Sequence, residues 1–331
     1  MESRKVRWGV LSTSRFGTEI AIPAMQKGKW PEIVAIASRD LGRAHAAAGR
    51  LGIPKAYGSY DELLDDPEVE VVYNPLPPHL HVPWSIRALE AGKHVLCEKP
   101  IARSASEASE LLSAAEAHPE LQVMEGFMYR FHPQWERVRG LVQEGRIGEL
   151  RAVHTTFSYF NENPEDIRNR PDVGGGGLLD IGCYAISVSR WLFGTKPRRA
   201  VAALELDARF GIDRRASAIL EFEAGIGSFT VATQLASYQR VSVLGTLGWI
   251  EVEIPFNPAR DRPTRVLHRT GGEVLEIVVE AADQDTLQAD RFSEAVLGLG
   301  PLPTPLSDAV ANMHVIDAVF ASAERGGWAD C

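Results

Sequence analysis

The first 125 residues alternate short apolar runs with amphipathic stretches. Continuous apolar runs of this length are typical of buried strands, and they predict strands at 6–11, 33–37, 69–73, 94–97 and 121–124. The stretches between them predict helices at 18–27, 41–51, 82–91 and 104–118. Strands that alternate with helices of this length indicate a parallel sheet with helices packed on it.

The pattern changes after residue 126. A helix is predicted at 132–144, and turn sequences at 223–225 and 245–248 predict hairpins. Strand-like runs follow at 150–160, 199–208, 216–223, 226–234, 239–244, 249–254, 264–268 and 273–280, and helices at 284–298 and 307–325 close the chain. We therefore predict an α/β protein whose C-terminal half is an α+β domain with a large, mostly antiparallel sheet.

Composition and charge narrow the class of protein. The 331 residues are 45% hydrophobic and 24% charged, which suits two globular domains. With 35 Lys and Arg against 44 Asp and Glu, the net charge of −9 argues against nucleic acid and anionic membrane as partners. No apolar run is long enough to span a membrane, and the N-terminus does not resemble a secretory signal.

The cysteines and histidines indicate the compartment and argue against a metal. Cys97, Cys183 and Cys331 are odd in number and form no C-x-x-C pair, so we expect reduced thiols, a cytoplasmic location and no cysteine zinc cluster. The histidines show no ligand spacing such as H-E-x-x-H, so no metal is expected.

The turn after the first strand is a candidate phosphate site. It occupies the place of a G-x-G-x-x-G fingerprint, but serines replace the first two glycines and only Gly17 matches. Serine is small enough for a close backbone approach, and its hydroxyl can donate to a phosphate. An ordinary strand-to-helix turn fits these six residues equally well. The candidate cofactor contacts in this turn are Ser12, Thr13, Ser14, Arg15 and Phe16.

The end of the second strand bears on which dinucleotide binds. NAD enzymes usually carry an acid here for the ribose 2′-hydroxyl, and Ser38 stands in its place. The next residue, Arg39, can stack on adenine and pair with a 2′-phosphate, which favours NADP(H). Asp40 leaves NAD(H) open, and Arg39 is alternatively an ordinary surface residue.

Four further segments carry a family resemblance. They are Y-N-P-L-P-P-H-L-H at 73–81, A-G-K-H-V-L-C-E-K-P at 91–100, E-G-F-M-Y-R-F-H-P at 125–133 and G-G-G-G-L-L-D-I-G-C-Y at 174–184. In this order they resemble the glucose–fructose oxidoreductase, inositol dehydrogenase and MocA (Gfo/Idh/MocA) family, of which E-K-P is a signature. The resemblance implies a dinucleotide-binding Rossmann domain at 1–126 and a substrate-binding, oligomerising domain at 127–331.

One motif position narrows the resemblance. The last residue of the glycine-rich motif is Tyr184, where inositol dehydrogenase-like members usually have His. A tyrosine there resembles the branch that contains glucose–fructose oxidoreductase, D-xylose dehydrogenase and dimeric dihydrodiol dehydrogenase.

The resemblance also implies roles for individual residues. Hydride transfer from an alcohol leaves a proton to remove, and Tyr184 is expected to exchange it while Lys99 polarises the oxygen and lowers the pKa of the tyrosine. Asp180 would orient a substrate hydroxyl or Lys99. Arg168 lies just upstream of the glycine run and is either a residue that reaches the substrate pocket or a surface residue. Without the motifs, Lys99 reads as a surface charge, Tyr184 as a core ring and Asp180 as a helix cap.

Further cofactor contacts follow from the same resemblance. Besides Lys99, they are Pro75, Leu76, His81 and Glu98. His81 has an alternative role as the cap of the helix that follows it.

The expected function is an NADP(H)-dependent oxidoreductase that transfers a hydride between nicotinamide and a hydroxyl or keto carbon of a sugar or polyol. The alternatives are a reductase of a nucleotide-linked keto sugar, a dehydrogenase of a non-sugar diol, and a non-catalytic dinucleotide-binding regulator. A homodimer or homotetramer built through the open face of the second sheet is also expected.

Overall fold

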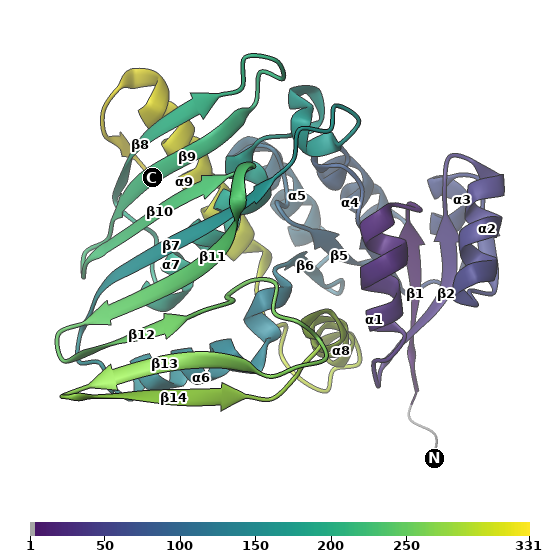
Figure 1. Ribbon diagram of the computed structural model, residues 1–331. Coiled ribbons are helices and arrows are strands. Elements are labelled where there is room, and N and C mark those ends of the chain that lie inside the picture. The colour runs from purple at the N-terminus through teal and green to yellow at the C-terminus, as the bar shows by residue number, and fades with distance from the viewer. Residues whose placement is uncertain (1–3) are drawn as a thin grey trace. The chain divides into compact units, whose positions relative to one another are not determined.

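The computed structural model describes residues 4–331, which form two compact units (Figure 1). The first unit consists of the chain up to Ala102, Ser106–Met128 and Asp283–Val310. The second unit consists of Arg103–Ala105, Tyr129–Ala282 and Ala311–Cys331. The first unit thus includes the segment 283–310, which lies far along the chain from the rest of that unit.

The first unit contains a six-stranded parallel sheet in the order β3-β2-β1-β4-β5-β6. Its strands are β1 (Val6–Leu11), β2 (Pro31–Ala37), β3 (Lys55–Tyr57), β4 (Val71–Asn74), β5 (His94–Glu98) and β6 (Val123–Gly126). Most residues of β1, β2 and β4 are buried, as expected for strands covered on both faces. This explains why they read as continuous apolar runs in the sequence.

The helices of the first unit alternate with its strands along the chain, except for α8. They are α1 (Ile22–Met25), α2 (Leu41–Leu51), α3 (Tyr60–Leu64), α4 (His81–Glu90), α5 (Ala105–Glu116) and α8 (Gln284–Val296). The carboxylate of Asp40 caps α2 by accepting from the Arg43 backbone N–H at 3.1 Å, and Gly52 ends the helix with φ +67°. The short elements β3 and α3 were not predicted.

The helix α8 belongs to the first unit, where it contacts Trp8 of β1 and Trp30, the residue just before β2. The Trp8 indole donates to Ser293 Oγ at 3.2 Å and packs edge-on against Phe292. The backbone N–H of Trp30 donates to Asp290 Oδ1 at 2.9 Å. These contacts give the predicted helix at 284–298 its place in the first unit.

The second unit contains a nine-stranded sheet in the order β14-β13-β12-β11-β7-β10-β9-β8-β15. Its strands are β7 (Leu150–Phe160), β8 (Arg199–Leu206), β9 (Asp213–Glu221), β10 (Ile226–Ala232), β11 (Gln234–Gly245), β12 (Gly248–Val252), β13 (Thr264–Thr270), β14 (Glu273–Val279) and β15 (Ala329–Asp330). All pairs are antiparallel except β7 with β10. The predicted fold class, a parallel sheet followed by a mostly antiparallel one, is confirmed.

Helices cover one face of this second sheet (Figure 1). A π-helical turn at Leu178–Gly182 runs directly into α7 (Cys183–Phe193), which packs on β7 and β10. The helix α6 (Pro133–Gln143) packs on β13, and Ser322 of α9 (Leu306–Arg325) accepts from Ala202 N of β8. Within residues 4–331, no helix has both the length and the apolar character needed to cross a membrane.

Candidate active site

The predicted cofactor residues gather at one edge of the first sheet. Ser12, Ser38, Pro75 and Lys99 each follow the last residue of a strand, and those strands (β1, β2, β4 and β5) are neighbours in the parallel sheet. The carboxyl edge of an open parallel sheet is where such folds bind ligands. The fold therefore brings together residues that are far apart in the sequence.

Serine hydroxyls close the candidate phosphate turn. Ser12 has φ +99°, a backbone conformation that glycine adopts readily and serine rarely does. Its Oγ accepts from Ser14 N at 3.0 Å, and Ser14 Oγ in turn accepts from Gly17 N at 3.1 Å. A Cβ at Gly17 would lie 3.0 Å from Ser14 Oγ, so the one retained glycine is where the turn is tightest. The backbone thus keeps the turn of the fingerprint without its first two glycines.

The other residues of the turn have different surroundings. Thr13 and Phe16 are half-buried, whereas Arg15 is exposed and pairs with Glu19 one helical turn further on at 2.8 Å. That hydrogen bond to Glu19 raises the pKa of Arg15. Pro75, on the loop after β4, lies 3.7 Å from where a Cβ at Gly17 would be. Pro75 therefore borders the candidate phosphate turn.

The residues after β2 differ in their availability to a cofactor. Ser38 is buried and its Oγ accepts from Asp40 N at 3.3 Å, while the Asp40 carboxylate is engaged as the cap of α2. Arg39 is exposed and interacts with the Tyr60 phenol. The Asp40 carboxylate is engaged as a helix cap and an exposed arginine stands beside it. This strand end therefore suits a 2′-phosphate better than a ribose 2′-hydroxyl.

Glu98, the last residue of β5, points into the unit. Its Oε1 accepts from the Tyr73 phenol at 2.7 Å. Burial raises the pKa of Glu98 to about 7, against the opposing effects of the Tyr73 hydrogen bond and of Lys99. A carboxyl group held in this way can support the strand end that presents Lys99.

His81 links the loop that follows β4 to the loop that follows β5. It is buried, with Nδ1 2.7 Å from Pro100 O and Nε2 2.5 Å from Leu76 O. Burial lowers the pKa of His81 to about 4, although both carbonyls favour the protonated ring. Pro100 directly follows Lys99, so His81 fixes the backbone next to that residue. Both ring nitrogens are used in this way, and His81 is also the first residue of α4.

In the second unit, the predicted substrate residues Arg168 and Asp180 lie together. Arg168 Nε donates to Asp180 Oδ2 at 3.2 Å, and its Nη1 contacts Asp166 Oδ1 at 3.3 Å. Tyr159 Oη donates to the same Asp180 oxygen at 2.6 Å. Asp180, burial and neighbouring charges leave Arg168 with a raised pKa, so its positive charge is secure. Arg168 and Tyr159 therefore both donate to the same oxygen of the Asp180 carboxylate.

Tyr184 stands in an aromatic cluster. Its ring centroid lies 5.1 Å from Phe256, 5.8 Å from Tyr129 and 5.9 Å from Phe157, and the residue is 4% exposed. Asp180 and Tyr184 are four residues apart in one continuous helical segment, which places them on adjacent turns of the same face. The packing restricts the ring to a narrow range of positions.

Tyr159 was missed by the sequence reasoning. The alternation along 150–160 did contain a signal, because Tyr159 is in phase with the buried Val153 and Phe157. That periodicity places it on the face of β7 that packs against α7, although it says nothing of Asp180.

Comparisons with known proteins agree with this geometry. The chain matches the model of the oxidoreductase family with an NAD-binding Rossmann fold over residues 6–127, and the GFO/IDH/MocA C-terminal domain over residues 135–251. It is 45% identical to an uncharacterized oxidoreductase of Rhizobium meliloti over 98% of both chains. It is 38% identical to the NADP-dependent D-xylose 1-dehydrogenase 2 of Haloferax volcanii over 96% of this chain and 98% of the relative.

A solved structure agrees over nearly the whole chain. KijD10, a 3-ketoreductase from Actinomadura kijaniata in complex with NADP and TDP-benzene, superposes with a TM-score of 0.90 at 31% identity, covering 96% of this chain and 98% of the other. The predicted family and the predicted class of enzyme, an oxidoreductase, are confirmed. Of the relatives, the D-xylose dehydrogenase is NADP-dependent and KijD10 was solved with NADP bound. The chain therefore belongs to the Gfo/Idh/MocA family of oxidoreductases.

Proposed function

We propose that the protein transfers a hydride between NADP(H) and a hydroxyl or keto carbon of a sugar or polyol. The observation that carries this proposal is the helical segment beginning at Leu178, which presents Asp180 and Tyr184 on one face, with Arg168 and Tyr159 fixed on Asp180. A polar carboxylate cluster next to a packed tyrosine suits a substrate rich in hydroxyl groups. The NADP-linked D-xylose dehydrogenase relative supports the same reaction.

The residues at the carboxyl edge of the first sheet fit NADP(H). The Ser12–Gly17 turn and the helix that follows it would hold the pyrophosphate, and Arg39 would pair with the 2′-phosphate. Held by these residues, NADP⁺ would supply the hydride acceptor for the substrate carbon.

The chain's own residues handle the proton that remains. We assign Tyr184 as the group that removes the proton from the reacting hydroxyl, or returns it in the reverse direction. The ammonium of Lys99 polarises the reacting oxygen and favours the phenolate. Asp180, held by Arg168 and Tyr159, accepts a hydrogen bond from a substrate hydroxyl and so orients the sugar.

Steady-state kinetics with NADP⁺ and NAD⁺ against aldoses and inositols tests these roles. We expect Lys99→Met and Tyr184→Phe each to lower kcat by about 10²- to 10⁴-fold with the best sugar. Lys29→Met and Tyr238→Phe, which alter residues outside the candidate site, should keep the activity. Near-full turnover in both Lys99→Met and Tyr184→Phe would refute the assignment, and no reduction of NADP⁺ with any sugar or polyol would refute the function.

A second candidate is reduction of a nucleotide-linked keto sugar, which the likeness to KijD10 favours. The same residues would act, with the proton moving from Tyr184 to the carbonyl oxygen. NADPH oxidation with a thymidine diphosphate keto sugar, absent with the corresponding free keto sugar, would identify this activity. Turnover of an aromatic diol in preference to both would instead indicate a non-sugar diol dehydrogenase.

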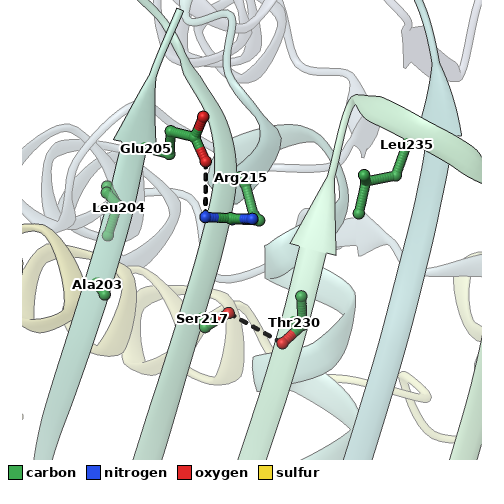
Figure 2. Close-up of a pocket in the computed structure, with 7 residues that line it drawn as sticks. All are labelled: Ala203, Leu204, Glu205, Arg215, Ser217, Thr230 and Leu235. Carbon is green, nitrogen blue, oxygen red and sulfur yellow. Dashed lines mark hydrogen bonds and ion pairs between the residues drawn. The ribbon is translucent and has the colours of Figure 1, made fainter.

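We also propose a homodimer or homotetramer that forms through the uncovered face of the second sheet. Figure 2 shows part of this face, where Glu205 pairs with Arg215 and Ser217 bonds to Thr230, in an open hollow. The seven described residues that line the hollow include none of the predicted site residues. Exposed Ile219 and Ile226 lie on neighbouring strands of the sheet.

Light scattering measures this assembly directly. Ile219→Arg should shift the mass toward the monomer, whereas Leu247→Arg in the β11–β12 turn should not. A monomeric wild-type protein would refute the proposal.

We also propose a cytoplasmic location for the protein, since Cys97 and Cys183 are buried and form no disulfide.

A further inference from the structure

A second carboxylate lies buried at the start of the helical segment that carries Asp180 and Tyr184. Asp213 is the first residue of β9 and is 5% exposed. Its Oδ2 accepts from the backbone N–H of Leu178 at 2.6 Å, and the backbone N–H of Gly177 also bonds to it. The first N–H groups of a helix have no partner within the helix, so Asp213 satisfies two of them from another strand.

The glycine run is shaped to let this carboxylate in. Gly176 has φ +119°, and a Cβ there would lie 2.1 Å from Asp213 Oδ1. A Cβ at Gly177 would lie 3.2 Å from the backbone oxygen of Asp213. No side chain at 176 is compatible with Asp213 in place. The run therefore does more than provide flexibility: it allows the close approach of Asp213.

We propose that Asp213 is a positioning residue for Asp180 and Tyr184, because its carboxylate anchors the first turn of the helix that presents both. This inference rests on the catalytic roles proposed above. Leu178 precedes Asp180 by two residues, so a shift of the first turn moves Asp180 directly. The shift reaches Tyr184 through the next turn of the same segment.

The surroundings of Asp213 make the anchor sensitive to pH. Burial raises the pKa of Asp213 to about 7, the negative charge of Asp180 adds to this, and the backbone N–H groups of Leu178 and Gly177 oppose it. Protonation converts one acceptor oxygen into a donor that faces backbone N–H groups, so the anchor weakens below about pH 7. A fall in kcat/KM for the sugar on the acid side of pH 7 is the expected consequence.

Kinetics of Asp213→Asn and Asp213→Ala test the proposal. We expect kcat/KM for the sugar to fall about 10- to 100-fold, while KM for NADP⁺, which the first unit holds, changes less than about 2-fold. In Asp213→Asn the acid limb near pH 7 should disappear. The matched control is Asp207→Asn, which alters another buried carboxylate that accepts from backbone N–H groups, those of Arg209 and Phe210, in the β8–β9 turn.

A second pair of variants tests the close approach of Asp213 without changing its carboxyl group. Gly176→Ala should reproduce the kinetic loss because its methyl group displaces Asp213. Gly211→Ala should not, since Gly211 has φ +69° but open space around it. Both glycines have a positive φ, but only Gly176 lies against Asp213.

Hydrogen exchange gives a readout that does not depend on turnover. In the wild type, the protection factors of a peptide covering 177–184 should fall between pH 8 and pH 6, and they should be low at both pH values in Asp213→Ala. Unchanged protection and unchanged kcat/KM in Asp213→Asn and Gly176→Ala, or equal losses in the Asp207 control, would overturn the proposal. If the wild type oxidises no sugar, the proposed function fails, but the exchange result still decides whether Asp213 anchors the helix.

Discussion

Tyr159 donates a 2.6 Å hydrogen bond to Asp180 Oδ2, the oxygen that Arg168 also reaches. Burial and the negative charge of Asp180 raise the pKa of the Tyr159 phenol, so it remains a donor throughout the physiological range. Asp180 thus has one oxygen occupied by a neutral and a cationic donor. The carboxylate is held in one orientation by groups from a strand and a loop.

Removal of the Tyr159 hydroxyl should therefore affect the sugar and leave the cofactor unaffected. We expect Tyr159→Phe to lower kcat/KM for the sugar about 10-fold, the effect of one hydrogen bond to a charged group. The matched control is Tyr57→Phe, which removes a phenol that bonds to Asp66 Oδ2 at 2.9 Å in the first unit. Equal activity of the Tyr159 and Tyr57 variants would contradict this role.

Arg39 should determine the choice between the two dinucleotides. We expect Arg39→Ala to raise KM for NADP⁺ about 10- to 100-fold, because a charge-assisted contact to the 2′-phosphate is lost, while KM for NAD⁺ stays nearly constant. Arg43→Ala, which removes another exposed arginine close to Asp40, is the control. Initial rates with both cofactors measure the ratio, and a wild-type preference for NAD⁺ would argue against this prediction.

The positive φ of Ser12 predicts an inverted order of stability among its variants. Alanine is normally more stabilising than glycine, but at φ +99° Ser12→Ala keeps the strain and loses the bond to Ser14 N. We expect Ser12→Ala to be less stable than Ser12→Gly by about 1 kcal/mol or more in urea unfolding. At Ser38, whose Oγ also bonds to a backbone N–H two residues on, the usual order should hold. The ordinary order at both positions would mean that Ser12 is not strained.

His132 should make stability depend on pH. Burial lowers its pKa from 6.5 to about 4. Between these values the unfolded chain binds a proton that the folded chain does not, so stability falls as the pH is lowered from 6.5 to 4, by up to about 3 kcal/mol. His132→Asn replaces the ring nitrogen that accepts from Gln134 N with a side-chain oxygen, so α6 keeps a cap while the titration is removed, and urea midpoints should vary less with pH. His132→Ala should lose the cap at every pH, and an unchanged pH slope in His132→Asn would contradict the assignment.

The sequence predicted the elements whose burial pattern is simple. The run at 6–11 and the helix at 41–51 coincide with β1 and α2, because one is a continuous apolar run and the other has Asp40 and Gly52 at its ends. The three residues of β3 are all half-buried and have neither an apolar run nor alternation. Their place in the sheet comes from pairing with β2, which local pattern does not encode.

The candidate site likewise contains residues that sequence reasoning proposed and residues that it missed. Lys99, Asp180 and Tyr184 lie within continuous motifs, so chain-local reasoning proposed them as site residues. Tyr159 and Asp213 reach the helix from other strands, 21 and 35 residues away from their partners along the chain. A sequence shows which strand face such a residue occupies, but the partner is set by the packing of that strand against α7.

The return of α8 to the first unit has a consequence for biosynthesis. Trp8 and Trp30 bind residues made more than 250 positions later, at Ser293 and Asp290. A nascent chain that has emerged only as far as residue 128 lacks these partners, so its nucleotide-binding half is incomplete while the ribosome makes the strands from β7 to β14. Completion of that half must wait for nearly full-length synthesis, and a fragment ending at the apparent domain boundary would leave both tryptophans without their partners.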